Sequence, residues 1–453
     1  MGYLPNSDAD RRAMLEAVGA DSPRDLFRSV PEHLLEHGAV LPPALGEQEL
    51  VEELGALAGA NTPMGTLPSF LGGGVYHRFI PAIVRATIAR PEFYTAYTPY
   101  QAEASQGTLQ TIFEFQSMLC AITGMDVCNA SMYDGATAAA EAALLAVAHT
   151  GRHRVLVSAG IHPETLAVLR TYGAGRGMAV DVAPLTAGRT AGDLTGLLTG
   201  DHAALLVAQP TWLGTVEDLA PLCDAAHAAG ALAVVMVDPL AATVLIAPGD
   251  AGADVVVGEC QPLGIPASFG GPHCGFVAVT TPLVRRMPGR LVGMTVDAAG
   301  RRAYSLTLQT REQHIRRERA TSNICTNHAL MALAATTYMA RMGAVGMRRV
   351  VELSAQRAHH LVDRLLELDG IELVNGDTPW LFEAALRLPG DVNAFVREMR
   401  AAGILAGLAA GRLDPDRRDQ LLVCCTEMTP AAAIDTYVER AAALLRTPAG
   451  AHR

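Results

Sequence analysis

A short stretch around residue 97 concentrates the phenol groups of a chain that is otherwise poor in aromatic side chains. Aromatic residues make up 5% of the 453 residues, yet three of the ten tyrosines, Tyr94, Tyr97 and Tyr100, fall within seven positions. Hydroxyl and amide groups are interleaved with them at Thr95, Thr98 and Gln101. Phenols and amides gathered on one loop are typical of a pocket for a small polar molecule. The alternative is a core loop, because a buried tyrosine finds a hydrogen-bond partner in most settings.

Residues 131–137 have the pattern of a turn that leads into a helix. Asp134 and Gly135 precede an alanine-rich run. Exposed backbone amides at a helix N-terminus attract anions, so this segment is a candidate anion site. Any capped helix has this pattern, so simple capping by a short polar side chain is the alternative and is favoured by the low specificity of the motif.

Residues 316–323 combine a run of arginines with three residues that suit a helix cap. Thr321, Ser322 and Asn323 are expected to cap the helix that follows. The arginines could then face a carboxylate or a phosphate at that helix start. Alternatively, they form a solvated charged face and pair with Glu312 and Glu318.

A fourth segment lies where two apolar runs end. Asp238 follows one run directly and is followed by Pro239, and residues 258–272 after the next run are rich in glycine and proline. A carboxylate just beyond a strand could hold the ring nitrogen of a cofactor. A turn formed by the Asp-Pro pair is the alternative.

The chain contains no lysine, and this absence limits its chemistry more than any motif does. All 35 basic residues are arginines, whose guanidinium groups stay protonated and cannot form a Schiff base. A Gly-Lys-Ser/Thr phosphate loop is excluded for the same reason, and no Gly-x-Ser-x-Gly elbow occurs. The eight cysteines are scattered without metal-ligand spacing, so we expect buried, reduced thiols and no metal site.

The elements that position these residues alternate between apolar strands and helices. Strands are expected at 155–157, 178–182, 204–208, 233–237, 253–257 and 276–279, and helices at 108–124, 136–149, 162–172 and 217–229. Continuous apolar strands separated by helices predict a mostly parallel sheet covered on both faces, with ligands at the carboxyl ends of its strands.

The remaining elements divide into an N-terminal and a C-terminal group. Residues 22–35 and 46–57 have helical spacing, and 311–319 reads as a polar helix. A long helix over 325–368 is expected to break at Gly343 and Gly346. Beyond it we expect strands at 371–374, 382–388 and 421–425 and helices at 391–402 and 430–445. Three domains follow: a helical arm over 1–70, a large α/β domain over 71–325 and a small α+β domain over 326–453.

Composition narrows the possible partners. A formal net charge of -11 disfavours nucleic acid and anionic membrane as partners. The N-terminal residues lack a basic segment followed by an apolar run, so no signal peptide is expected, and a cytoplasmic location follows.

Taken together, these segments resemble the glycine cleavage system P-protein family, and in particular its separately encoded subunit 1. The resemblance runs from about residue 5 to 445 and is carried by residues 70–81, 92–107, 123–126, 129–137, 258–272 and 308–326. It implies a fold-type I pyridoxal-phosphate transferase architecture. It also implies that pyridoxal phosphate is bound covalently by a lysine of the partner, subunit 2. By that comparison Gln261 stands at the lysine position, Cys260 at the position of the preceding histidine, and Asp238 is the relic of the ring-nitrogen acid.

The resemblance also implies a reaction and a set of partners. With subunit 2, as a heterodimer that pairs further into a dimer of heterodimers, the chain would decarboxylate glycine, release CO2 and transfer the aminomethyl group to the lipoylated H-protein. The T- and L-proteins would take part indirectly. Residues 94–101 would line the glycine pocket, and Thr321, Ser322 and Asn323 would approach the cofactor phosphate across the interface.

Two alternatives stay open. The chain could be a catalytically silent subunit that only stabilises its lysine-bearing partner. It could also be a free-standing enzyme or cofactor-binding protein, against which the missing lysine argues.

Overall fold

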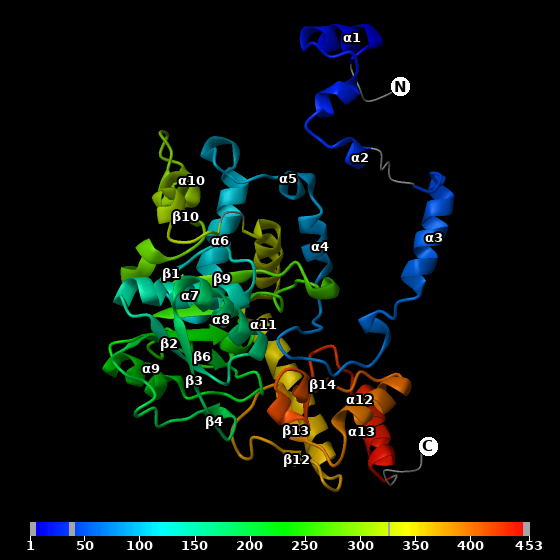
Figure 1. The fold of residues 1–453 in the computed structure, drawn as a ribbon. Helices are drawn as coiled ribbons and strands as arrows, with labels where there is room; N and C mark the ends of the chain where they lie inside the picture. The colour runs from blue at the N-terminus through cyan, green and yellow to red at the C-terminus, as the bar shows by residue number, and fades with distance from the viewer. Residues whose placement is uncertain (1–5, 36–40, 325–326, 447–453) are drawn as a thin grey trace. The chain divides into compact units, whose positions relative to one another are not determined.

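The computed structural model describes residues 6–35, 41–324 and 327–446, and the chain divides into two compact units, Met1–Thr62 and Pro63–Arg453 (Figure 1). The first unit contains α1 (Asp8–Ala17), η1 (Pro23–Phe27), α2 (Glu32–Leu35) and α3 (Glu47–Gly59). The helix expected over 46–57 is confirmed. The one expected over 22–35 is divided in two, because Pro31 disfavours helical backbone at the residue before it. Of the described residues in this unit, only Ala20 is buried.

A seven-stranded sheet forms the centre of the second unit, and it is mostly parallel as expected. Its order is β1 (Val127–Cys128), β9 (Gly275–Val279), β8 (Val255–Glu259), β7 (Leu232–Val237), β6 (His202–Gln209), β2 (Arg154–Ser158) and β3 (Ala179–Ala183). Strands β8, β7, β6, β2 and β3 run parallel, and β9 at one edge pairs antiparallel with both β8 and β1. All eight residues of β6 are buried, which explains its continuous apolar run.

Helices cover both faces of this sheet. Val155 and Val157 of β2 pack into the cluster that contains α7 (Gly135–Thr150), whereas Leu156 between them points into the larger cluster on the other face. The larger cluster contains residues of α6 (Gln106–Thr123) and α9 (Leu219–Ala228), and α8 (Pro163–Arg176) packs beside α7. The alternation follows from the period of two along a strand.

Several elements between the sheet and the C-terminal region were not anticipated. A hairpin joins β10 (Leu291–Val296) to β11 (Arg302–Thr307), and a second short hairpin joins β4 (Leu185–Thr186) to β5 (Arg189–Thr190). The polar helix expected over 311–319 is wrong as a single element. The chain instead forms η7 (Gln309–Arg311), α10 (Gln313–Arg316) and η8 (Arg317–Arg319), because Arg317 adopts a left-handed conformation with φ 54°.

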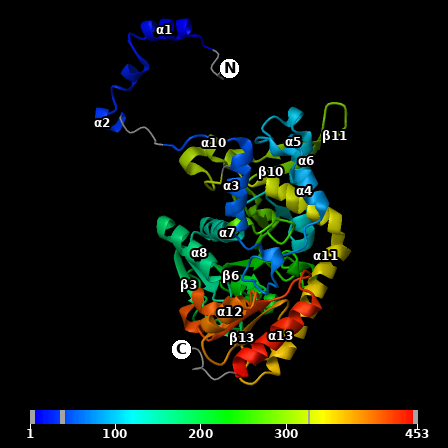
Figure 2. The ribbon, with the colours of Figure 1, turned by 90° about the vertical axis from the view of Figure 1, so that its right-hand side faces the viewer.

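The long helix α11 (Ala329–Leu366) runs from the region of the seven-stranded sheet to the C-terminal residues (Figure 2). It packs against α4 (Ala82–Ile88) and α6 at one end and against α13 (Ala431–Arg446) at the other. The expected break at Gly343 is confirmed by its φ of 61°, whereas Gly346 stays helical.

The C-terminal residues form the expected α+β arrangement. Four antiparallel strands follow the order β12 (Glu372–Leu373), β13 (Glu383–Arg387), β15 (Gln420–Cys424) and β14 (Leu408–Ala409). Helices α12 (Val392–Ala401) and α13 accompany this sheet (Figure 1). The expected domain boundaries at 70 and 325 stay predictions. In the part of the chain that the structure describes, no helix is both long and apolar enough to span a bilayer.

Candidate functional site

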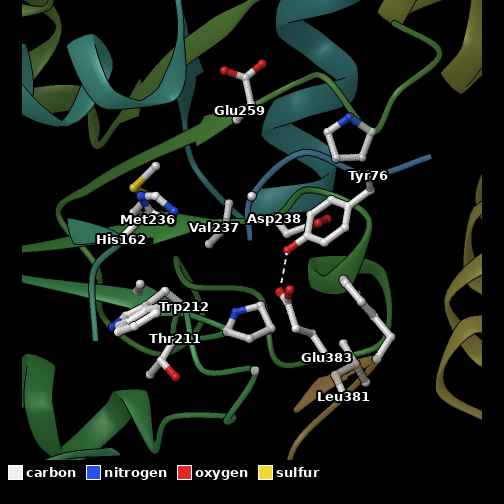
Figure 3. A pocket seen from close by; sticks show the side chains of 16 residues that line it. Tyr76, His162, Thr211, Trp212, Met236, Val237, Asp238, Glu259, Leu381 and Glu383 are labelled. Atoms are coloured by element: carbon white, nitrogen blue, oxygen red, sulfur yellow. Dashed lines mark hydrogen bonds between the residues drawn. The ribbon is translucent and has the colours of Figure 1, made fainter. Parts of the chain in front are cut away.

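A small cavity lies at the carboxyl edge of the large sheet, where β6, β7 and β8 end. Its volume is about 100 Å³, and it is lined by the strand ends, by the segment before α4 and by β13 (Figure 3). The polar lining residues are Tyr76, His162, Thr211, Asp238, Glu259 and Glu383. The position agrees with the expectation that ligands gather at the carboxyl ends of parallel strands.

Asp238 forms a turn and also presents an oxygen to the cavity. Its Oδ1 accepts hydrogen bonds from the backbone N–H groups of Leu240 (2.8 Å) and Ala241 (3.0 Å). Its Oδ2 is buried and has no hydrogen-bond partner among the described residues. Burial raises the pKa of this carboxyl group, and the nearby Arg78 guanidinium opposes that shift. The turn expected from the Asp-Pro pair is present.

Gln261, the other expected relic of a cofactor site, is buried and fully engaged with the backbone. Its Oε1 accepts from Tyr76 N–H at 2.9 Å, and its Nε2 donates to the Tyr76 carbonyl at 3.0 Å and to the Ile265 carbonyl at 2.9 Å. The neighbouring Cys260 is also buried, and burial raises the pKa of its thiol. The Gln261 side chain therefore closes the edge of the sheet instead of facing a ligand.

Glu383 is a cavity residue that the sequence interpretation missed. Its Oε1 accepts from Gly73 N–H at 2.6 Å, and its Oε2 accepts from the Tyr76 hydroxyl at 3.0 Å (Figure 3). Burial raises the pKa of this carboxyl group to about 7. The only signal in the sequence was a carboxylate inside the apolar strand over 382–388, which is unusual because buried carboxylates need partners.

The candidate anion site at the start of α7 is occupied by a side chain of this chain. Asp134 caps the helix by accepting from Thr137 N–H at 2.7 Å, so the capping alternative is confirmed. The Gly135 N–H donates to Glu259 Oε2 at 3.0 Å. Glu259 Oε1 accepts from Gln261 N–H (2.9 Å) and Cys274 N–H (3.2 Å). A carboxylate thus takes the place that an anionic ligand would have at this helix start.

The tyrosine loop lies on the surface, which contradicts the alternative of a core loop. Tyr94 and Tyr97 are 71% and 82% exposed. Together with Thr98 they line a hollow of about 300 Å³ whose other polar lining residues are Thr108, Thr111, Arg290, Asn327 and His328.

The other three polar residues of the loop, Thr95, Tyr100 and Gln101, do not line this hollow. Thr95 Oγ1 donates to the Pro91 carbonyl at 2.7 Å, Tyr100 contacts His314 and lies near the Arg290 guanidinium, and Gln101 precedes the short helix η3 (Ala102–Ala104). Some of the predicted pocket residues therefore line the hollow, whereas the others contact neighbouring residues outside it.

Thr321, Ser322 and Asn323 do not cap the helix that follows, so that expectation was wrong. Helix α11 begins at Ala329, and the three residues lie in an earlier turn. The Ser322 side chain is buried and its Oγ accepts from Ile324 N–H at 3.1 Å, which commits it to its own turn. Thr321 and Asn323 are exposed. The pairing expected for the arginines is also only partial: Arg319 lies 3.7 Å from Glu318, whereas Glu312 lies near His314.

Comparison with known proteins identifies the family. The model of the glycine cleavage system P-protein matches residues 1–439. A protein of Exiguobacterium sibiricum named "probable glycine dehydrogenase (decarboxylating) subunit 1" is 47% identical over 441 residues, which are 96% of this chain and 97% of the relative. A relative of the same name from Thermomicrobium roseum is 47% identical over 97% of this chain and 98% of its own length.

This chain belongs to the glycine cleavage system P-protein family. A solved structure described as a glycine decarboxylase (P-protein) in inhibitor-bound form superposes with a TM-score of 0.90 at 44% identity, covering 98% of this chain and 100% of that one. A sphingosine-1-phosphate lyase of Burkholderia pseudomallei (TM-score 0.64, 15% identity, 91% and 94% covered) shares the fold alone. The fold is therefore the fold-type I architecture that the resemblance implied.

The cavity of this P-protein chain does not fit the pyridoxal phosphate that the resemblance implies for the family. No lysine is available for a Schiff base, and Gln261, which the resemblance places at the lysine position, is held by three hydrogen bonds. The Gly135 N–H at the start of α7 is bonded to Glu259, and the remaining space is about 100 Å³. The polar groups of Gln261 and Glu259 at this sheet edge are consequently committed to contacts within the chain.

Proposed function

We propose that this chain is the cofactor-free subunit 1 of a two-subunit glycine decarboxylase of the glycine cleavage system. The observation that carries the proposal is the combination of family membership over nearly the whole chain with a sheet edge where Gln261 and Glu259 are bonded to the chain's own backbone. An enzyme of this family needs a lysine for its Schiff base, so subunit 2 must supply it.

The reaction we propose for the pair is the decarboxylation of glycine, with pyridoxal phosphate held by subunit 2. CO2 is released and the aminomethyl group passes to the lipoyl arm of the H-protein. The cofactor supplies the electron sink for loss of CO2. The T- and L-proteins act on later steps of the same system, and the complex is a heterodimer that pairs again. The compartment we propose is the cytoplasm.

The part of this chain that we propose to complete the partner's site is the exposed tyrosine loop. Tyr94 and Tyr97 carry phenol groups on surface side chains at the rim of a hollow, where a facing subunit could enclose them. The exposed Thr321 and Asn323 are proposed to approach the cofactor phosphate across the interface, whereas the Ser322 hydroxyl already has a local partner.

The test is glycine–bicarbonate exchange with lipoylated H-protein and pyridoxal phosphate, measured for this chain alone, for subunit 2 alone and for the mixture. We expect activity only in the mixture. Full activity of subunit 2 alone would reduce this chain to a structural subunit. Activity of this chain alone would contradict the argument from the missing lysine.

Single substitutions distinguish a subunit that contributes side chains to the partner's active site from one that only stabilises the partner. Tyr97→Phe and Thr321→Ala each remove one hydroxyl from an exposed residue, and we expect each to lower kcat/KM of the mixture by about tenfold, the loss of roughly one hydrogen bond. Tyr172→Phe on α8 is the matched control and should leave the rate unchanged. A silent subunit would tolerate all three substitutions.

A further inference from the structure

A buried arginine lies in the lining of the hollow beside the tyrosine loop, and no carboxylate compensates its charge among the described residues. Arg290 is 3% exposed. Among the described residues it forms no ion pair, and its guanidinium donates from Nη1 to Asn327 Oδ1 at 3.1 Å. Its Nε is buried without a partner in the described part of the chain. An uncompensated buried guanidinium is costly, and an anion from outside would relieve that cost.

The surroundings of Arg290 fit a small anion. The hollow has a volume of about 300 Å³, and the charged or polar side chains in its lining are tyrosine, threonine, asparagine, histidine and Arg290 itself, with no carboxylate. Tyr100 lies with its ring 5.8 Å from the guanidinium carbon. Hydroxyl and amide donors around a guanidinium suit a carboxylate, which accepts several hydrogen bonds on its two oxygens.

Arg290 is also held in one place, as a binding residue must be. The Arg290 carbonyl accepts from Ala130 N–H at 3.0 Å, and Asn327 donates in turn to the Ala130 carbonyl. A Cβ on the preceding Gly289 would lie 2.8 Å from Asn129 Nδ2, so the backbone here lies too close to its neighbour for any larger residue. The guanidinium is therefore presented to the hollow by a fixed segment of backbone.

We propose that Arg290 binds the carboxylate of a small amino acid in this hollow, with the tyrosine loop forming the rim of the site. The inference rests on the proposed function, and it deepens that function by naming the residue that would orient glycine. A carboxylate held by Arg290 would lie on this chain and leave the amino group pointing out toward the partner, which carries the cofactor. No other described residue in the lining of this hollow supplies a buried positive charge.

The first experiment uses this chain alone, so its outcome does not depend on the decarboxylase activity. The thermal unfolding midpoint is measured with added glycine, formate or methylamine at constant ionic strength. We expect glycine and formate to raise the midpoint and methylamine, which lacks a carboxylate, to leave it unchanged. Arg290→Met should remove the response, and Arg290→Lys should weaken it because a single ammonium cannot make the planar, two-pronged contact.

The second experiment tests the same residue in the complex. Arg290→Met mixed with subunit 2 should raise KM for glycine by at least about tenfold, while kcat changes much less, since the carboxylate contact is equally present before and during reaction. Arg348→Met is the matched control, because Arg348 is an exposed arginine on α11. Arg290→Lys should recover part of the affinity.

Three results would overturn the proposal. The first is an equal stabilisation of wild type and Arg290→Met by formate and glycine. The second is an unchanged KM for glycine in both variants. The third is a loss of subunit 2 binding by Arg290→Met without any effect of glycine or formate on this chain, which would assign the guanidinium to a carboxylate of the partner.

Discussion

Buried polar side chains at the carboxyl edge of the large sheet bond to this chain's own backbone. The Gln261 amide oxygen accepts from the Tyr76 N–H, and the Glu259 carboxylate accepts from the Gly135 N–H. The Glu383 carboxylate accepts from the Gly73 N–H and from the Tyr76 hydroxyl. Each of these contacts satisfies a group that would be costly to bury alone. At the scale of single residues, the cavity is therefore a structural element whose loss should appear in stability rather than in ligand binding.

Replacing Gln261 tests this structural role. Gln261→Ala leaves the Tyr76 N–H and the Tyr76 and Ile265 carbonyls without their partner, so the free energy of unfolding should fall by about 1–3 kcal/mol. Urea unfolding monitored by circular dichroism measures the change. The control is Gln110→Ala, since Gln110 is exposed and bonds to Glu114 on the same helix. A loss no larger than that of the control would refute the role given to Gln261.

The raised pKa of Glu383 leads us to expect that the stability of the folded chain depends on pH. Burial raises the pKa of its carboxyl group from 4.5 to about 7, so between these values the folded state binds more protons than the unfolded state. The free energy of unfolding should therefore fall as pH rises through this window, by roughly 3 kcal/mol for a shift of this size, and stay level above it. Glu383→Gln should make this slope smaller because the amide does not titrate, whereas Asp238, whose pKa burial also raises, still does.

Urea unfolding at several pH values between 4.5 and 8 measures this dependence for the wild type and for Glu383→Gln. The matched control is Glu398→Gln, which replaces an exposed glutamate on α12 and should keep the wild-type slope. Identical slopes in the wild type and Glu383→Gln would show that another group titrates.

At the scale of elements, the start of α7 and the end of β8 form one unit. A Cβ on Gly135 would lie 3.1 Å from the Glu259 Cβ, and one on Gly275 would lie 2.2 Å from the Asp134 carbonyl oxygen. The helix start and the strand ends are thus in direct contact, with no space for a bulky group between them. The two carboxylates, Asp134 and Glu259, also place negative charge where the helix dipole favours an anion.

Removing Glu259 should reopen this helix start to anions. In Glu259→Ser, inorganic phosphate should raise the thermal unfolding midpoint relative to chloride at equal ionic strength, whereas the wild type should not respond. Asp391→Ser is the matched control, because Asp391 caps α12 by accepting from Asn393 N–H at 2.9 Å. An equal response of wild type and Glu259→Ser to phosphate would contradict the role of Glu259.

At the scale of the molecule, the first unit lacks a core of its own in the residues that the structure describes. Only Ala20 is buried there, while α3 exposes the apolar side chains Leu50, Val51, Leu54 and Leu57. Apolar side chains that share one exposed face usually mark a surface that another protein covers. Taken by itself, the first unit therefore presents an apolar helix face that needs packing from outside the unit, and we expect subunit 2 to supply it.

Hydrogen exchange of α3 checks this expectation. The amides of residues 47–59 should exchange rapidly in the isolated chain, because a short helix without packing has little stability, and slowly after subunit 2 is added. The strand β6 is the internal reference, since all of its residues are buried and should be protected in both states. Equal exchange of α3 with and without subunit 2 would show that its apolar face has another role.

Much of the fold was predictable because its signals are local. The apolar runs of β6 and β7, the alanine-rich run of α7 and the break at Gly343 each reflect a preference that neighbouring residues express without knowledge of the rest of the chain. The errors arose where local preference was overridden. Ser322 was expected to cap the following helix, but its hydroxyl accepts from the N–H of Ile324, two residues later. The helix expected over 311–319 is interrupted at Arg317, which has a positive φ.

The sequence by itself determined that no lysine of this chain can form a Schiff base, because the chain has none and folding cannot supply the missing side-chain amine. It also determined the α/β class and drew attention to the tyrosine loop. Only the tertiary structure decided that Glu383 bonds to Gly73, 310 residues away, and that Gln261 bonds to Tyr76, 185 residues away. It also decided that Arg290 is buried without a carboxylate partner among the described residues. Such contacts depend on the register and packing of distant segments, which local sequence patterns do not encode.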